Sequence, residues 1–228
     1  MKIFLLELPE YLESTSEIFF LERVETEKKK QINKFIYKED RYRSLLGDVL
    51  VRYACLTELA IDNKDIVFYK NNYGKPYLCK YEHFHFNISH SGKWVVCVVG
   101  DTPLGVDIEE ITEIDLGITK FFSEWERDYI NGGIGIGKRE RFFDIWTLKE
   151  SYIKAVGRGM GIELDSFTIL YEGLEPKLIT TCDSGQTKYF FKQYNLLPNY
   201  KLSVCTMSNI FPNELEYVDI PLLLKCLK

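Results

Sequence analysis

Hydrophobic positions follow two spacings along the chain, and together they predict alternating strands and helices. Residues 2–8 form a short apolar run that is typical of a strand. Residues 17–34 and 38–61 have the three-to-four spacing of amphipathic helices, and the apolar face of the second carries Leu45, Leu46, Val49, Leu50, Tyr53 and Leu56. Strands are expected at 65–70, 83–89 and 93–100, with a turn at 71–76.

The same order of elements is predicted again in the second half. A strand at 104–110 precedes helices at 116–130 and 138–157, and strands follow at 165–171, 188–195 and 200–207. Even the charges repeat, because Asp48 and Arg52 have the spacing of Glu150 and Lys154, although no residue-by-residue identity links the halves. We therefore predict an α+β pseudo-dimer of two similar α/β lobes, residues 1–102 and 103–228, with the active site in the cleft between them.

Composition and charge narrow the classes of protein. The 228 residues are 46% hydrophobic, which is enough for a sizeable core, and the net charge of -5 argues against a nucleic-acid binder. The opening residues do not read as a signal peptide, and no run approaches the ~18 apolar residues of a membrane helix. The six cysteines, at 55, 79, 97, 182, 205 and 226, form no C-x-x-C pair and are expected to be small buried side chains in a reducing compartment. We expect a cytoplasmic protein that contacts no membrane.

The segment GVDIE, residues 105–109, is the first candidate for chemistry. Alternate strand residues share a face, so Val106 and Ile108 would point into the core while Asp107 and Glu109 point together to the other side. Carboxylate oxygens of this kind suit Mg²⁺, which takes one or two carboxylates together with substrate phosphates. A solvated strand face would explain an isolated D-x-E pattern equally well.

The segment FNISHSGK, residues 86–93, joins two apolar strands through a turn. Its hydroxyls, imidazole and free backbone N–H groups could bind an anion, or the segment could be an ordinary hairpin turn. His83 and His85 share a strand face and could bind Zn²⁺ with His90, but no further ligand at a suitable spacing completes a tetrahedral site. Two surface histidines are the simpler interpretation.

Two glycine-rich or basic segments need separate interpretations. Residues 132–138 fit G-x-x-x-x-G-K, but Arg139 stands where a phosphate-binding loop needs Ser or Thr, so a loop before a helix is expected. Lysines 28–30 and the segment 38–43 are basic, and they could form a solvated face or meet a polyanionic small molecule.

The helix segment WTLKESYIK, residues 146–154, places Glu150 and Lys154 one turn apart on one face. A surface ion pair and a catalytic carboxylate are both compatible with this spacing. Taken with the acidic strand, the turn and the basic residues, the segment favours Mg²⁺-assisted chemistry on a phosphorylated ligand. From the residues alone, a hydrolase, a transferase and a nucleotide-binding module all stay open.

The three segments FNISHSG, GVDIE and WTLKESYIK, in this order and at these separations, resemble the 4′-phosphopantetheinyl transferases. The segments at 37–52 and 73–76 resemble the surfactin-synthetase-activating branch, whose chains are of this length and monomeric. The resemblance runs from about residue 28 to residue 170. It implies transfer of the phosphopantetheine arm of coenzyme A to a serine of an apo acyl or peptidyl carrier protein, with release of adenosine 3′,5′-bisphosphate. A non-catalytic coenzyme A or nucleotide-binding module and a Mg²⁺-dependent phosphohydrolase are the alternatives.

The resemblance also implies roles for particular residues. Asp107, Glu109 and Glu150 would hold Mg²⁺, Glu150 or a metal-bound water would take the proton of the carrier serine, and Lys154 would stabilise the pyrophosphate charge. Coenzyme A would contact Ser89 and His90 through its phosphates, Lys75 and its turn on the adenine side, and Lys28 and Arg43 near the 3′-phosphate.

The sequence departs from the branch at two places. Gln31 stands where a second lysine is common, with Lys29 or Lys30 as substitutes, and a glycine-rich loop follows the region near 115–135 where the carrier protein would dock. Mg²⁺ and Mn²⁺ both suit these oxygen ligands.

Overall fold

The computed structural model describes residues 1–173, 175–180, 188–195 and 197–228. Cys182 and the other residues between these ranges lie outside the described residues. The first part of the chain forms β1 (Lys2–Glu7), α1 (Ser14–Arg23), α2 (Thr26–Ile32), α3 (Lys38–Leu59), β2 (Phe68–Lys70), β3 (Pro76–Leu78), β4 (His85–Ser91), β5 (Trp94–Gly100) and β6 (Leu104–Glu110). The rest forms α4 (Glu124–Asn131), α5 (Ile136–Val156), β7 (Phe167–Glu172), β8 (Glu175–Thr180), β9 (Phe190–Tyr194), β10 (Tyr200–Thr206), β11 (Glu216–Val218) and α6 (Ile220–Cys226).

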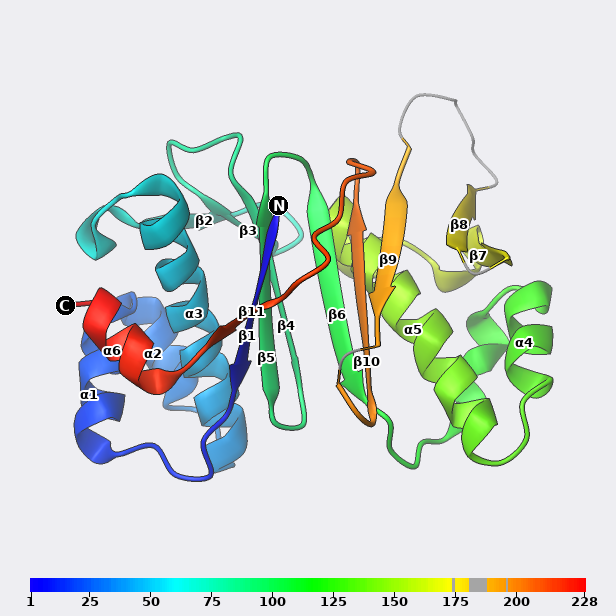
Figure 1. Ribbon diagram of the computed structural model, residues 1–228, viewed down its shortest axis with the longest axis horizontal. Coiled ribbons are helices and arrows are strands. Elements are labelled where there is room, and N and C mark those ends of the chain that lie inside the picture. The colour runs from blue at the N-terminus through cyan, green and yellow to red at the C-terminus, as the bar shows by residue number, and fades with distance from the viewer. Residues whose placement is uncertain (174, 181–187, 196) are drawn as a thin grey trace.

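Two main sheets stand between two groups of helices (Figure 1). The first sheet has the order β11-β1-β5-β4 and the second has the order β6-β10-β9. Helix α3 packs on the outer face of the first sheet, with α1, α2 and α6 packed against α3. Helix α5 covers the outer face of the second sheet, with α4 beyond it. The predicted α+β class is confirmed. Each main sheet packs against one long helix, α3 or α5, which is compatible with the predicted pair of similar lobes.

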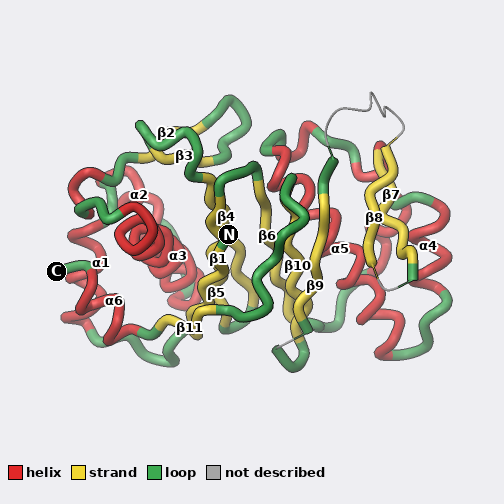
Figure 2. The backbone as a smooth tube through the Cα atoms, turned by 45° about the horizontal axis from the view of Figure 1, so that its top comes forward, coloured by secondary structure: helices red, strands yellow, loops and turns green. Residues whose placement is uncertain are grey.

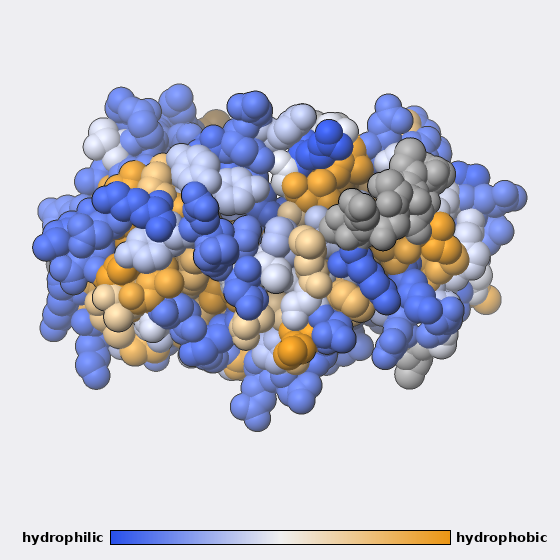
Figure 3. Space-filling view, turned by 90° about the horizontal axis from the view of Figure 1, so that it is seen from above, coloured by the Kyte–Doolittle hydropathy of each residue, from blue (hydrophilic) through white to orange (hydrophobic). Residues whose placement is uncertain are grey.

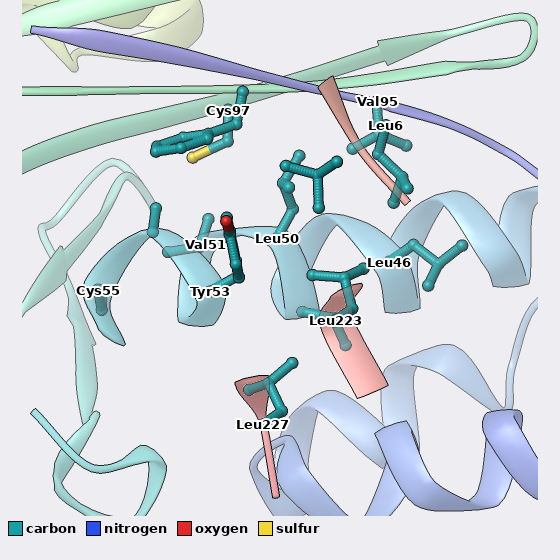
Figure 4. Packing of buried hydrophobic residues seen from close by; sticks show 14 of the residues in the cluster. Leu6, Leu46, Leu50, Val51, Tyr53, Cys55, Val95, Cys97, Leu223 and Leu227 are labelled. Atoms are coloured by element: carbon teal, nitrogen blue, oxygen red, sulfur yellow. The ribbon is translucent and has the colours of Figure 1, made fainter. Parts of the chain in front are cut away.

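Alternation along β1 and β5 gives the first sheet two buried faces. One face packs on the helices, where Leu46 and Leu50 of α3 lie between the sheet residues Leu6 and Val95 and the α6 residue Leu223 (Figure 4). The other face presents Ile3, Leu5, Val96 and Val98 to the second sheet, whose contribution includes Val106, Ile108, Leu202 and Val204. Strands buried on both faces explain the nearly continuous apolar runs in the sequence.

The C-terminal segment returns to the first sheet (Figure 2). From β10 the chain crosses to β11, which pairs in parallel with β1, with Leu5 opposite Tyr217. Leu223 and Leu227 are then buried among α1 and α3. The sequence pattern did not predict β11 or α6.

The predicted helix 17–34 is wrong as a single helix, because the structure breaks it between α1 and α2. Val24 and Glu25 have extended backbones. The Val24 side chain is buried in the core, and the Glu25 carboxylate accepts a hydrogen bond from Phe68 N and lies near Arg52. Tertiary contacts therefore override the helical periodicity at this point.

The predicted helix 116–130 is also divided. Residues 116–121 form a 3₁₀ helix, Phe122 is extended and buried, and Ser123 starts α4 through a capping box with Glu126. The next helix, α5, begins at Ile136 rather than 138. The predicted strand 65–70 keeps only residues 68–70, and the hairpin partners β3 and β8 were not predicted.

The face seen in Figure 3 is largely hydrophilic, and the described helices are short or polar. Seen from above the view of Figure 1, hydrophilic side chains cover much of both ends of the molecule and hydrophobic ones form separate patches (Figure 3). In the ranges that the structure describes, every helix is too short or too polar to cross a bilayer.

Candidate active site

A cleft with a volume of about 370 Å³ lies between the helical layer of the first sheet and α5. Its first wall, from α2, α3 and β4, carries Lys28, Arg43, Asp48, Ser89 and His90. Its second wall, from β6 and α5, carries Asp107, Glu109, Trp146, Glu150 and Lys154. The strand alternation predicted for GVDIE is confirmed, because Val106 and Ile108 are in the core while the two carboxylates line the cleft.

Asp107 is the most deeply buried charged group of the cleft, with a side chain only 4% exposed. Its Oδ1 accepts hydrogen bonds from Lys154 Nζ at 2.6 Å and from Ser89 Oγ at 3.0 Å. Burial raises the pKa of Asp107, and the Lys154 ammonium and these hydrogen bonds counteract that rise. Its Oδ2 is buried and makes no hydrogen bond within the described structure.

Glu109 lies two residues further along β6. Its Oε2 accepts a hydrogen bond from Ser91 Oγ at 2.8 Å. Burial and the nearby Asp107 raise the pKa of Glu109, while hydrogen bonds from Ser91 and Trp146 and the Lys154 charge lower it. The carboxylate is thus held from both sides, by β4 and by α5.

Glu150 faces the same two carboxylates from α5. Burial raises its pKa first, and the charges of Asp107 and Glu109 raise it further, with Lys154 opposing them. A cation would be stabilised beside these three carboxylates, because Asp107 raises the pKa of both Glu109 and Glu150, and Glu109 raises that of Glu150. Within the described ranges, no three His, Cys, Asp or Glu side chains already converge closely enough to hold a metal ion, so the three would have to draw together around one.

Gly105 allows α5 to lie directly on β6. A Cβ atom at this position would come within 2.1 Å of Ser151 O and 2.4 Å of Ala155 N. The contact is supported from β10, where Ser203 Oγ lies 2.7 Å from Thr147 Oγ1 of α5. This close approach explains how Lys154 of the helix reaches Asp107 of the strand.

The basic side of the cleft is formed by Lys28, Arg43 and His90. Burial lowers the pKa of Lys28, although Asp48 counteracts this change. Arg43 is oriented by Asp40 and by the carbonyl of Gly92, to which its Nε donates at 2.9 Å. Desolvation and the charges of Lys154, Arg43 and Lys28 lower the pKa of His90, so the cleft has a cationic region next to its carboxylates.

Comparisons with known proteins agree with this geometry. A family model described as "4'-phosphopantetheinyl transferase, N-terminal" matches residues 13–102, and one described as "4'-phosphopantetheinyl transferase superfamily" matches residues 103–205. The chain is 36% identical over 220 residues to 4'-phosphopantetheinyl transferase Sfp of Bacillus subtilis, covering 96% of this chain and 98% of that protein. The chain belongs to the 4′-phosphopantetheinyl transferase family. The resemblance drawn from the sequence motifs is thereby confirmed, as is the prediction of a transferase.

Other relatives extend the comparison. The transferase is 37% identical to 4'-phosphopantetheinyl transferase gsp of Aneurinibacillus migulanus, over 86% of this chain and 81% of that one. Among solved structures, a holo-(acyl-carrier-protein) synthase from Bacillus anthracis in complex with CoA is 22% identical with a TM-score of 0.40, covering 46% of this chain and 94% of that one.

Of the nine residues predicted for the site, the structure brings eight to one cleft and leaves one outside the lining. The eight are Lys28, Arg43, Ser89, His90, Asp107, Glu109, Glu150 and Lys154. The lining does not include Lys75, whose Nζ instead donates to the carbonyls of Leu104, Lys154 and Ala155 at 3.0, 2.6 and 3.1 Å. The Lys75 ammonium therefore ties the β2–β3 hairpin to the end of α5.

The basic run contributes one side chain to the cleft. Lys28 lines it, whereas Lys30 pairs with Glu27 at the surface and Gln31 is exposed. In the transferase, therefore, the described lining gives no sign that Lys29 or Lys30 replaces the lysine missing at Gln31.

The alternative zinc interpretation receives no support. His85 and His90 lie near opposite ends of β4, paired with Gly100 and Val95, and His83 precedes the strand. The glycine-rich segment 132–138 leads into α5, as a loop before a helix should, with Gly135 at the N-cap.

Sequence reasoning missed several residues that shape the site. Asp48 and Trp146 line the cleft, Ser91 holds Glu109, and Gly105 sets the contact between α5 and β6. A signal for Ser91 was present, because Asn87, Ser89 and Ser91 alternate on one face of β4.

Proposed function

We propose that this transferase moves the 4′-phosphopantetheine group of coenzyme A to a serine hydroxyl of an apo acyl or peptidyl carrier protein, and releases adenosine 3′,5′-bisphosphate. The observation that carries the proposal is the cleft, where Asp107, Glu109, Glu150 and Lys154 face the cations Lys28 and Arg43. A polyphosphate donor needs both sides: cations for its phosphates, and carboxylates for a divalent ion at the reacting pyrophosphate.

The chemistry of the three carboxylates suits a Mg²⁺ ion, around which they would draw together. The buried Asp107 Oδ2 finds no hydrogen-bond partner among the described residues, although buried polar atoms are normally paired. Glu109 and Glu150 have pKa values raised by burial and by neighbouring carboxylates, and a cation would relieve that repulsion. When bound, Mg²⁺ would neutralise charge on the pyrophosphate and orient it for attack.

The side chains of the second wall would then carry the transfer. Glu150, whose raised pKa increases its affinity for a proton, would accept the proton of the carrier serine. The serine oxygen would form a bond to the phosphorus of the phosphopantetheine phosphate, while the bond from that phosphorus to the bridging oxygen breaks. Lys154, close to Asp107 and Ser89, would stabilise the negative charge that grows on the departing phosphate.

The first wall would hold the adenosine end of coenzyme A. Lys28 and Arg43 would bind the 3′-phosphate and His90 a neighbouring phosphate, and the turn that contains Lys75 would face the adenine through its backbone. Ser89 has one hydroxyl proton, and in the structure it is donated to Asp107. A Ser89 contact with a phosphate would have to replace that hydrogen bond.

We further propose a monomer that docks its carrier protein near residues 115–135. Support for the monomer is that one chain supplies both walls of the cleft. Support for the docking region is its exposed Phe121 and Trp125, and the neighbouring Phe122 stacks on Trp146 of α5, which lines the cleft.

The test is to mix the protein with coenzyme A, Mg²⁺ and several apo carrier proteins and to measure the mass of each carrier. We expect a gain of one phosphopantetheine on at least one carrier, and no gain with Asp107→Ala. Release of adenosine 3′,5′-bisphosphate without a carrier would favour the phosphohydrolase. Binding of coenzyme A without any modified carrier would favour the non-catalytic module.

A further inference from the structure

The two main sheets meet at β4 and β6, and side chains bridge them there. Both are edge strands of their own sheets, and no backbone ladder joins them in the described structure. Instead, three side-chain oxygens of β4 accept hydrogen bonds from backbone N–H groups of β6. The hydrogen bonds run from Val106 N to Asn87 Oδ1 at 2.9 Å, from Ile108 N to Ser89 Oγ at 3.3 Å, and from Glu110 N to Ser91 Oγ at 3.1 Å.

The spacing of these contacts is regular. From one hydrogen bond to the next, the donor moves two residues along β6 and the acceptor two residues along β4. The two joined residues are therefore always 19 positions apart in the sequence, as expected for neighbouring parallel strands. We name these three contacts the side-chain ladder. A shift of β6 by one residue would place side chains of the opposite face at the cleft, and the side-chain ladder opposes such a shift.

Two rungs of the side-chain ladder also hold the carboxylates of the site. Ser89 donates its hydroxyl proton to Asp107 Oδ1 at 3.0 Å, and Ser91 donates its own to Glu109 Oε2 at 2.8 Å. Each serine hydroxyl thus accepts a hydrogen bond from the backbone N–H of one β6 residue. It donates a hydrogen bond to the side-chain carboxylate of the preceding β6 residue. Because a hydroxyl has a single proton, the direction of both hydrogen bonds is fixed.

Ser91 and Ser89 differ in the other contacts that their carboxylate partners make. Asp107 keeps its ion pair with Lys154 if Ser89 is removed, whereas Glu109 has only Trp146 as a further hydrogen-bond donor among its described neighbours. Side chains that orient a metal ligand commonly change metal affinity by about 10–100-fold when removed. Glu109 therefore depends more on its serine than Asp107 does.

We propose that Ser91 is a positioning residue that orients Glu109 for the divalent cation, and that the side-chain ladder sets the two acidic residues of β6 against the phosphate-binding wall. The inference rests on the proposed function for the identity of the cation. It assigns roles in the site to Ser91 and Asn87, although neither residue lines the cleft.

The experiment compares Ser91→Ala, Ser91→Thr and Ser123→Ala with the unchanged chain. Free Mn²⁺ is measured by electron paramagnetic resonance during titration of each protein with coenzyme A present and no carrier protein. Ser91→Thr keeps the hydroxyl on a strand-compatible side chain. Ser123→Ala removes the cap of α4, which packs on α5 and β7, and serves as a control for lost stability. We expect Ser91→Ala to weaken Mn²⁺ binding about tenfold and the other two to stay within about twofold.

Two outcomes would overturn the inference. One is Mn²⁺ affinity in Ser91→Ala that equals that of Ser123→Ala, and the other is a loss in Ser91→Thr as large as in Ser91→Ala. If Ser91→Ala does not fold, as judged by thermal unfolding, Ser91→Cys serves in its place, because a thiol is only a weak hydrogen-bond donor. The unchanged chain is tested for carrier modification in parallel. If it binds Mn²⁺ but modifies no carrier, the proposed function fails and the role of Ser91 is still decided by the affinities.

Discussion

Lys154 Nζ lies 2.6 Å from Asp107 Oδ1, so an ion pair joins the last turn of α5 to the middle of β6. The aspartate side chain is 4% exposed and that of the lysine 28%. The pair is therefore neither a surface contact nor a fully buried one. Its acidic member is almost completely buried at the base of the cleft, and its basic member is more exposed there.

Replacement of Lys154 by Met should lower both stability and transfer. Asp107 would remain buried with its charge unpaired, and we expect the free energy of unfolding to fall by about 2 kcal/mol. Urea denaturation measures this change. Lys177→Met, which removes an exposed pair with Glu172, should cost less than about 0.5 kcal/mol. Equal losses in the two variants would contradict a structural role for the Lys154 pair.

Glu150→Gln should separate activity from stability. Its pKa is raised by burial and by Asp107 and Glu109, so the neutral amide relieves repulsion in the folded state. We expect transfer to fall by about 100-fold or more while the free energy of unfolding stays equal or rises by about 1 kcal/mol. Carrier mass spectrometry and urea denaturation provide the two values. Near-normal transfer in the presence of Mg²⁺ would show that Glu150 neither binds the ion nor accepts the proton.

Gly105→Ala should push α5 away from β6. The added Cβ would stand 2.1 Å from Ser151 O, a backbone atom that cannot rotate aside. We expect a loss of about 2–3 kcal/mol in the free energy of unfolding.

Gly137→Ala is the matched control for Gly105→Ala. It adds the same methyl group in the first turn of α5, with nothing within 4 Å, and should be neutral or stabilising by about 0.5–1 kcal/mol. If Gly105→Ala is as stable as this control, the close contact of α5 with β6 is not required for folding.

Lys75 should make stability rise with pH in alkaline solution. Burial lowers its pKa from 10.5 to about 8. Between these values the unfolded chain holds more protons than the folded one, so removal of protons favours the folded state. Relative to Lys75→Met, the free energy of unfolding of the unchanged chain should increase by on the order of 2 kcal/mol from pH 8 to pH 10.5. A difference between the two proteins that stays flat or falls over this range would contradict the buried, charged state of Lys75.

Much of the site was predictable because its residues belong to short patterns in the sequence. Alternation in GVDIE placed Asp107 and Glu109 on one face, and helical spacing placed Glu150 with Lys154. Both patterns depend only on neighbours in sequence. The convergence of the two segments came from the family resemblance, since no periodicity indicates which strand lies under which helix.

The misses arise where a distant partner decides the local structure. Val24 and Glu25 leave the helix because one is buried in the core and the other meets Phe68 N. The contact of Lys75 with coenzyme A stays a prediction, but residue spacing gave no sign that its ammonium would donate to carbonyls at the end of α5. Such contacts exist only after the fold has formed, and they leave no trace in residue spacing.

The return of β11 and α6 to the first sheet has a consequence for synthesis on the ribosome. β1 is made before the other described strands, yet its neighbour β11 and the buried Leu223 and Leu227 are made after all of them. The first sheet and its helices should therefore not close until residues 216–227 have been made, whereas the strands β6, β9 and β10 emerge before those residues. A nascent chain stalled short of residue 216 should therefore be far more sensitive to protease in α1 and α3 than the released protein.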